Sequence, residues 1–171
     1  YGPLFDGGAG SSFDEFKFLA CAGDVVDDIS GQLSQLPNHI RPGLVTLTAA
    51  GNDAHFGDVL FYCIRSFNCQ QDSRYAGLFD EITDFDDRLR DLYLQAKARA
   101  NAADAQVIVF AYPQLFSSVK DNDCLSDLGF EQDERVWIRS LVSHMNDVIQ
   151  STAAEVGVTG IQLSGPTPNA A

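Results

Sequence analysis

The chain has 171 residues, 45% of them hydrophobic, which is enough for one globular domain with its own core. Its 24 Asp and Glu residues outnumber 11 Lys and Arg and give a net charge of −13. An acidic surface of this kind disfavours binding to nucleic acid and to anionic membranes. No apolar run approaches the roughly 18 residues of a membrane-spanning helix, so none is expected.

The first half of the chain alternates between strand and helix patterns after an irregular lead-in at 1–14. The apolar run 16–22 predicts a short buried strand. A helix is predicted to follow, with Asp24 as its N-cap and Pro37 beyond its end, because apolar residues recur there at helical spacing. Residues 44–49 then predict a second strand, of the continuous apolar kind found in parallel sheets covered on both faces. A short helix is expected around 56–66.

The second half repeats the alternation. A long helix is predicted over roughly 75–101, with acidic residues crowding its first half and basic residues its second, an order that suits the helix dipole. Residues 106–112 predict a third buried strand. The last helix is predicted around Trp137 to Thr152, and 156–163 predicts a fourth strand. This alternation indicates a single α/β domain over 1–171, built on a parallel sheet with helices on both faces.

Four cysteines are present, namely Cys21, Cys63, Cys69 and Cys124. They form no CxxC pair and have no histidine at ligand spacing, so we expect no zinc site, and the sequence predicts no other cofactor. Cys63 and Cys69 are spaced for a local disulfide, whereas Cys21 and Cys124 need not pair with each other. The even count and the acidic surface favour a secreted, extracellular protein, with four buried thiols as the alternative.

Two predicted strands end in residues that can donate hydrogen bonds to a reacting atom. The first ends at Gly23, whose backbone N–H is open to close approach, and the second ends in Gly51-Asn52-Asp53, where the Asn52 amide carries two N–H donors. Ligands of open α/β sheets bind beyond the carboxyl ends of strands, so Gly23 and Asn52 are candidates for an oxyanion hole. The alternative is that Gly-Asn-Asp is an ordinary turn.

Aromatic residues gather in the stretch that follows the second strand. They either belong to the core, which their proximity to helices favours, or wall an apolar cleft for an acyl chain: Phe56, Phe61, Tyr62, Phe67, Tyr75 and Phe79.

Three stretches, taken in order, resemble the SGNH hydrolases, also called GDSL esterases and lipases, and in particular their secreted fungal and actinobacterial branch. FKFLACAGDVVDDISGQL at 16–33 is similar to the second sequence block of that family. LVTLTAAGNDAHFGDVLFYC at 44–63 is similar to the third block, and VIVFAYPQLFSSVKDNDC at 107–124 to a stretch after the long middle helix.

The resemblance implies a flavodoxin-like, three-layer α/β/α sandwich that hydrolyses a small-molecule ester through a serine nucleophile. In such enzymes a histidine oriented by an aspartate activates the serine, while a glycine N–H, an asparagine side chain and the serine N–H hold the oxyanion. Carried onto this chain, the resemblance assigns Gly23 and Asn52 to the oxyanion hole.

The family's first block, Gly-Asp-Ser, and its last block, Asp-x-x-His, do not occur in the chain. Ser11 and Ser12 follow no apolar strand, which argues against a nucleophile there. His39 is expected in a solvated loop and His144 on a helix as a structural residue. His55, three residues beyond Asn52, is the most interesting of the three histidines, although local structure is favoured over acid–base work.

Two interpretations follow. Either the domain is incomplete at both ends, and a companion chain or segment supplies the serine and the Asp-His pair, or the protein is a non-catalytic lipid- or carbohydrate-binding protein on the same scaffold. The first is favoured, because loss of the strand before the nucleophile also removes a central element of the sheet. It predicts an exposed sheet edge.

Overall fold

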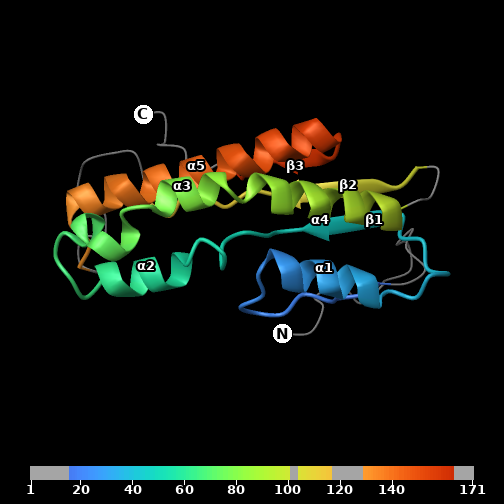
Figure 1. Ribbon diagram of the computed structural model, residues 1–171, viewed down its shortest axis with the longest axis horizontal. Coiled ribbons are helices and arrows are strands. Elements are labelled where there is room, and N and C mark those ends of the chain that lie inside the picture. Colours follow the sequence, from blue (N-terminus) through green and yellow to red (C-terminus); the bar gives the residue numbers. More distant parts are fainter. Residues whose placement is uncertain (1–15, 101–103, 117–128, 164–171) are drawn as a thin grey trace, which may run out of the picture.

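A computed structural model of the chain describes residues 16–100, 104–116 and 129–163. Three strands alternate with helices along the chain, as Figure 1 shows. The elements are α1 (Val26–Gln35), β1 (Leu44–Leu47), α2 (Phe56–Cys63), the 3₁₀ turns η1 (Cys69–Gln71) and η2 (Ser73–Tyr75), α3 (Leu78–Thr83), α4 (Asp86–Arg99), β2 (Gln106–Phe110), α5 (Gln132–Val156) and β3 (Thr159–Ile161).

The three strands form one parallel sheet in the order β1-β2-β3. The prediction of an α/β fold with a parallel sheet is therefore confirmed. Helices α1, α4 and α5 pack on one another in sequence, and α4 and α5 also contact the sheet, so they form one layer on one face (Figure 1). Right-handed crossovers that advance in one direction across a sheet place their helices on the same face. The second helical layer of a sandwich is not found in the described ranges.

Burial alternates along the strands and separates the two faces of the sheet. Val45 and Leu47 of β1 register with Val107 and Val109 of β2, and all four are buried under the helices. The opposite face carries apolar residues that remain partly or largely exposed, namely Leu44, Ile108, Phe110 and Ile161. The strands thus have the two-sided apolar composition of a sheet covered on both faces, while only one face is covered by described residues.

The predicted strand at 16–22 is wrong. Its residues are in no strand and pair with none, Ala22 already belongs to a turn, and Phe16 and Phe18 are exposed. The apolar pattern identified a segment suited to a sheet, but a strand also needs a hydrogen-bonded neighbour, and none of the described residues supplies one. The edge of β1 away from β2 likewise has no partner strand in the described ranges.

Asp24 is not the N-cap of α1, contrary to the prediction. The N-cap residue is Val25, and the backbone N–H of Val26 donates to Asp53 Oδ2 at 3.0 Å from the turn after β1. Asp53 can satisfy this helix N–H from 27 positions away because the turn after β1 lies beside the start of α1.

The predicted long helix at 75–101 is also interrupted, since α3 ends at Thr83 and α4 begins at Asp86. Five acidic residues fall between 80 and 87, and a continuous helix would hold them within two turns. The break gives Asp86 and Asp87 a new helix N-terminus, where the dipole favours negative charge.

A disulfide joins Cys63 and Cys69, as the sequence predicted, and closes a short loop after α2. The backbone N–H of Cys69 donates to Glu134 Oε1 at 2.9 Å, and Glu134 Oε2 accepts from the Glu131 N–H at 2.9 Å. Glu134 is fully buried. Its carboxylate therefore fastens the disulfide loop to the start of α5. Cys21 is an exposed thiol, and Cys124 lies outside the described residues.

We expect Glu134→Ala to lower the free energy of unfolding by about 3 kcal/mol, because the buried backbone N–H of Cys69 and the partly buried one of Glu131 lose a charged acceptor. Glu134→Gln keeps one acceptor oxygen and should lose less. Chemical denaturation of both variants measures the difference. Asp133→Ala, which removes an exposed carboxylate from the same turn, is the matched control and should change stability by less than about 0.5 kcal/mol. Equal losses in the Ala variants of 133 and 134 would contradict the anchoring role.

Candidate active site

The turn after β1 is a compact, internally hydrogen-bonded structure. The N–H groups of Ala54, His55 and Phe56 donate to the carbonyls of Ala50, Asn52 and Gly51 over 3.0 to 3.1 Å. Ala50 has a φ of 81° and His55 a φ of 50°, two left-handed residues within six positions. The turn predicted from Gly-Asn-Asp is therefore present, and it places Asn52 at its exposed outer corner.

Asn52 and Gly23 are brought together at this corner. The Asn52 Nδ2 donates to the backbone carbonyl of Asp24 at 2.7 Å, and Gly23 precedes that residue with a φ of 89°. A side chain is disfavoured at such a φ, which explains the glycine. Both residues are exposed. One hydrogen of the Asn52 amide is directed to the Asp24 carbonyl, which leaves the second as a donor.

Asp53 anchors this turn to two helices. Its carboxylate, only 2% exposed, accepts from the Val26 N–H at 3.0 Å and pairs with the Arg88 guanidinium at 2.5 Å. Arg88 also lies 3.6 Å from Asp27. One buried carboxylate therefore ties the Asn52 turn to α1 and α4. The sequence identified Asp53 only as a turn residue, because nothing local indicates partners 27 and 35 positions away.

Tyr112, just beyond β2, supports the other side of the turn. Its hydroxyl accepts from the Gly51 N–H at 3.0 Å. Its backbone N–H and carbonyl bond to the Oδ1 and Nδ2 of buried Asn146, each at 2.8 Å. Burial raises the pKa of the Tyr112 phenol, so the hydroxyl stays protonated at neutral pH. Tyr112 and Asn146 were missed by sequence reasoning, since a tyrosine at a strand end and an asparagine in a helix have no distinctive local signal.

The three histidines do not complete a nucleophilic triad in the described residues. His39 is exposed. His55 points its Nδ1 toward Asp58 at 3.9 Å, and both side chains are largely exposed. The Nε2 of His144 contacts Thr83 Oγ1 at 2.9 Å and the Phe79 carbonyl at 3.1 Å, which gives this histidine a structural role.

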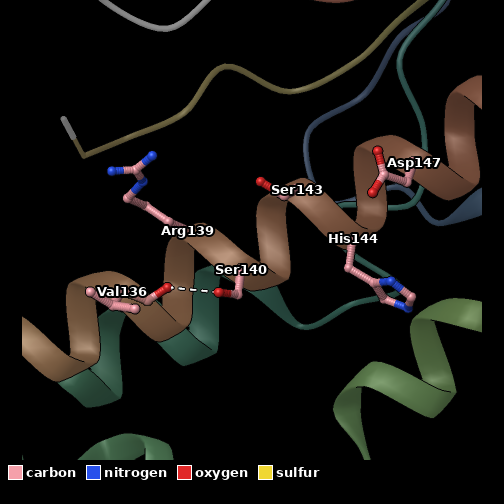
Figure 2. Close-up of a pocket in the computed structure, with 6 residues that line it drawn as sticks. All are labelled: Val136, Arg139, Ser140, Ser143, His144 and Asp147. Carbon is pink, nitrogen blue, oxygen red and sulfur yellow. Dashed lines mark hydrogen bonds between the residues drawn. The ribbon is translucent and has the colours of Figure 1, made fainter. Parts of the chain in front are cut away.

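A groove of about 400 Å³ along α5 does hold serine, histidine and aspartate side chains together. Figure 2 shows that Ser143 and Asp147 project from one side of the helix while the His144 ring projects toward α3. The Nε2 atom of this ring is already within hydrogen-bonding distance of Thr83 Oγ1 and the Phe79 carbonyl, both on α3. A base must reach the proton of its nucleophile, so this groove has the residue types of a triad without its geometry.

Within the described ranges, no three His, Cys, Asp or Glu side chains gather as metal ligands. None of the helices described has the combination of length and apolarity needed to cross a bilayer.

No protein family model matches the chain. Two curated lipases of Streptomyces coelicolor are similar to it. Lipase 1 is 29% identical over 153 residues, which cover 88% of this chain and 54% of the lipase. Lipase 2 is 28% identical over 129 residues, covering 71% and 44%. The chain thus spans about half the length of these relatives.

Two crystal structures also resemble the chain. Phospholipase A1 from Streptomyces albidoflavus NA297 superposes with a TM-score of 0.60 at 28% identity, over 85% of this chain and 59% of the enzyme. An extracellular lipase from Streptomyces rimosus superposes with a TM-score of 0.66 at 25% identity, over 86% and 60%. Over most of its length, the chain is therefore similar in sequence and in fold to lipases of Streptomyces.

Proposed function

We propose that this chain forms the oxyanion-binding part of a serine-type carboxylic ester hydrolase of the SGNH class. The Gly23 backbone N–H and the second hydrogen of the Asn52 amide are the donors. The observation that carries the proposal is the 2.7 Å bond from Asn52 Nδ2 to the carbonyl beside Gly23, at the carboxyl end of β1. This bond supports the proposal because it links the Asn52 amide to the residue next to Gly23, at an exposed strand end of the kind where ligands of parallel sheets bind.

These two donors stabilise the negative charge that develops on the ester carbonyl oxygen. A serine oxygen adds to the ester carbonyl carbon, its proton passes to a histidine, and the carbonyl oxygen becomes an oxyanion. The histidine then protonates the departing alcohol, and water releases the acid in the second half. Each well-placed donor contributes about 10²-fold to 10³-fold to kcat by binding the oxyanion more strongly than the carbonyl.

We further propose that the serine and the Asp-His pair reside in a segment outside these 171 residues. Among the described residues, one edge of β1 has no partner strand and one apolar face of the sheet has no covering helix. Both support the proposal, because a further strand and helix would bury such surfaces. The relatives extend well beyond the matched region, which supports it as well.

Photo-cross-linking tests the segment. Thr46 of β1 is exposed on the uncovered face, while Leu94 of α4 is exposed on the helical layer. With a benzophenone amino acid at 46 in the natural polypeptide that carries this chain, we expect a cross-link to a peptide outside residues 1–171. The same probe at 94 should give none. A probe at 46 that reacts with nothing, or only with another copy of residues 1–171, would contradict the proposal.

Hydrolysis tests the activity. The natural polypeptide should hydrolyse p-nitrophenyl butyrate, and a fluorophosphonate should label one serine and abolish turnover. Absence of both turnover and labelling would overturn the hydrolase and leave the binding-protein interpretation. The Cys63–Cys69 disulfide and the likeness to an extracellular lipase support an extracellular location, which activity in the culture medium rather than in cells would establish.

A further inference from the structure

Three large apolar side chains project into solvent directly after the candidate site. Phe61, Ile64 and Phe67 are 57%, 49% and 79% exposed, and Phe67 is the most exposed large hydrophobic residue among those described. We call these three residues the 61–67 patch. A spacing of three residues keeps Phe61 of α2 and Ile64, the C-cap residue of that helix, on the same side. Single exposed apolar residues are ordinary, but a cluster beside a functional site indicates a binding surface.

The patch is held in place rather than left loose. The Cys63–Cys69 disulfide encloses Ile64 and Phe67, and the buried Glu134 carboxylate binds the Cys69 N–H. Gly129 packs so closely on the Ile64 carbonyl that a Cβ there would lie 3.3 Å from the oxygen. The disulfide and the buried Glu134 carboxylate therefore fix the backbone from which Ile64 and Phe67 project into solvent.

The patch borders charges of both signs, as a zwitterionic headgroup does: Arg65 contacts Phe61, while Glu131 and Asp133 line a hollow with Phe67. The Arg65 guanidinium carbon lies 3.7 Å from the centre of the Phe61 ring, so a cation sits among the apolar side chains. An arginine in this position can keep its stem on apolar surface and its head at a phosphate. The net charge of −13 opposes approach to an anionic surface, which favours a zwitterionic one.

The area of the patch favours a lipid surface over a protein partner. Large aromatic side chains bury about 150 to 250 Å² each, and the two phenylalanines and one isoleucine of the patch are only partly exposed, so together they supply less than about 500 Å². A stable protein interface needs about 800 Å² on each partner. Insertion into a lipid surface has no such requirement, because a few apolar side chains can enter the boundary between headgroups and acyl chains.

We propose that the 61–67 patch docks the protein on zwitterionic phospholipid and so delivers lipid esters to Asn52. Helix α2 begins at Phe56, four residues after Asn52, and the patch follows from its second half onward, so one short helix connects the candidate oxyanion hole to the docking surface (Figure 1). The delivery step rests on the proposed function, whereas the docking itself needs no catalysis.

Fluorescence with phosphatidylcholine vesicles tests the docking on the intact chain. In Phe67→Trp, the new indole should shift its emission to shorter wavelength on vesicle addition and be quenched by brominated acyl chains. Leu94→Trp, on α4, is the matched control and should show neither effect. The native Trp137 contributes the same background to both variants.

Sedimentation with the same vesicles measures affinity. The double variant Phe61→Ser, Phe67→Ser should bind at least about tenfold more weakly, whereas Leu94→Ser, Val136→Ser should bind as the parent chain does. Circular dichroism of the variants confirms that the fold is kept. Phosphatidylglycerol vesicles should bind more weakly than phosphatidylcholine.

Equal vesicle binding by both double variants, or no binding by the parent chain, would overturn the proposal. So would self-association that Phe67→Ser abolishes in the absence of vesicle binding, since the occupant would then be a second copy. If the parent chain does not bind vesicles while the natural polypeptide still hydrolyses p-nitrophenyl butyrate, this inference alone is overturned. If the parent chain binds vesicles but the natural polypeptide hydrolyses no ester, the proposed function is overturned and the lipid-binding role of the 61–67 patch is retained.

Discussion

Replacing Asp53 with alanine should lower the free energy of unfolding by about 3 kcal/mol, because the buried carboxylate bonds both to Arg88 and to the start of α1. The loss combines an uncapped Val26 N–H with an arginine deprived of its closest partner. Urea denaturation followed by circular dichroism measures it. Asp58→Ala, an exposed carboxylate on α2, is the matched control and should stay within about 0.5 kcal/mol of the parent.

A second variant separates the two bonds of Asp53. Arg88→Met keeps the cap on Val26 but leaves the buried carboxylate without its cation, and a loss of about 3 kcal/mol or more is expected. The double variant Asp53→Ala, Arg88→Met should lose less than the two single losses added together. Strict additivity would mean that the two side chains act independently, contrary to the 2.5 Å contact.

Gly51→Ala should be the other strongly destabilising change. A Cβ at residue 51 would lie 2.6 Å from the Tyr112 hydroxyl oxygen and 2.9 Å from the adjoining ring carbon. Tyr112 cannot swing away freely, because Asn146 holds its backbone through two hydrogen bonds. Overpacking and the strained bond from the Gly51 N–H should together cost about 2 to 4 kcal/mol of unfolding free energy.

Tyr112→Phe provides the test of that cause. Without the hydroxyl, the closest atom to the new Cβ is gone, so Gly51→Ala should cost less in the Tyr112→Phe background than in the parent chain. Gly57→Ala is the control, since a Cβ there meets no atom within 4 Å. Thermal melts of the parent chain, the two single variants and the double variant measure both costs. An equal cost of Gly51→Ala in both backgrounds would contradict the clash with Tyr112.

The sequence predicted the fold class and most elements, because the parallel strands and the helix α5 have strong local patterns. The Cys63–Cys69 disulfide was also predicted, since a separation of 6 in the sequence needs only a short loop to bring the two cysteines together. The strand at 16–22 was predicted wrongly for a physical reason. Apolar density indicates that a segment suits a sheet, but only a neighbouring strand completes the hydrogen bonds.

The candidate site was predicted in part. The sequence named Gly23 and Asn52 as candidate donors, and in the structure the Asn52 amide bonds to the carbonyl of the residue after Gly23, although no strand precedes Gly23. Their role in catalysis stays a prediction. Their supports were not found. Asp53 reaches Arg88 over a separation of 35 residues, and Asn146 reaches Tyr112 over 34. Contacts of this range depend on how the layers pack, which no local pattern encodes.

The aromatic cluster shows the same limit. Phe56, Tyr62, Tyr75 and Phe79 pack against the core, as the sequence favoured. Phe61 and Phe67 project outward instead. Composition identified the cluster as a unit, while only the helical phase of α2 and the disulfide loop decide which members face solvent.

The most direct test of the account is the kcat of Asn52→Ala in the natural polypeptide, measured with p-nitrophenyl butyrate. An oxyanion donor acts in the transition state, so kcat should fall by about 10²-fold to 10³-fold with KM nearly unchanged. Asn68→Ala, a polar and exposed asparagine in the disulfide loop, should leave kcat unchanged. A folded Asn52→Ala variant that retains the parent kcat would contradict the assignment of this residue to the oxyanion hole.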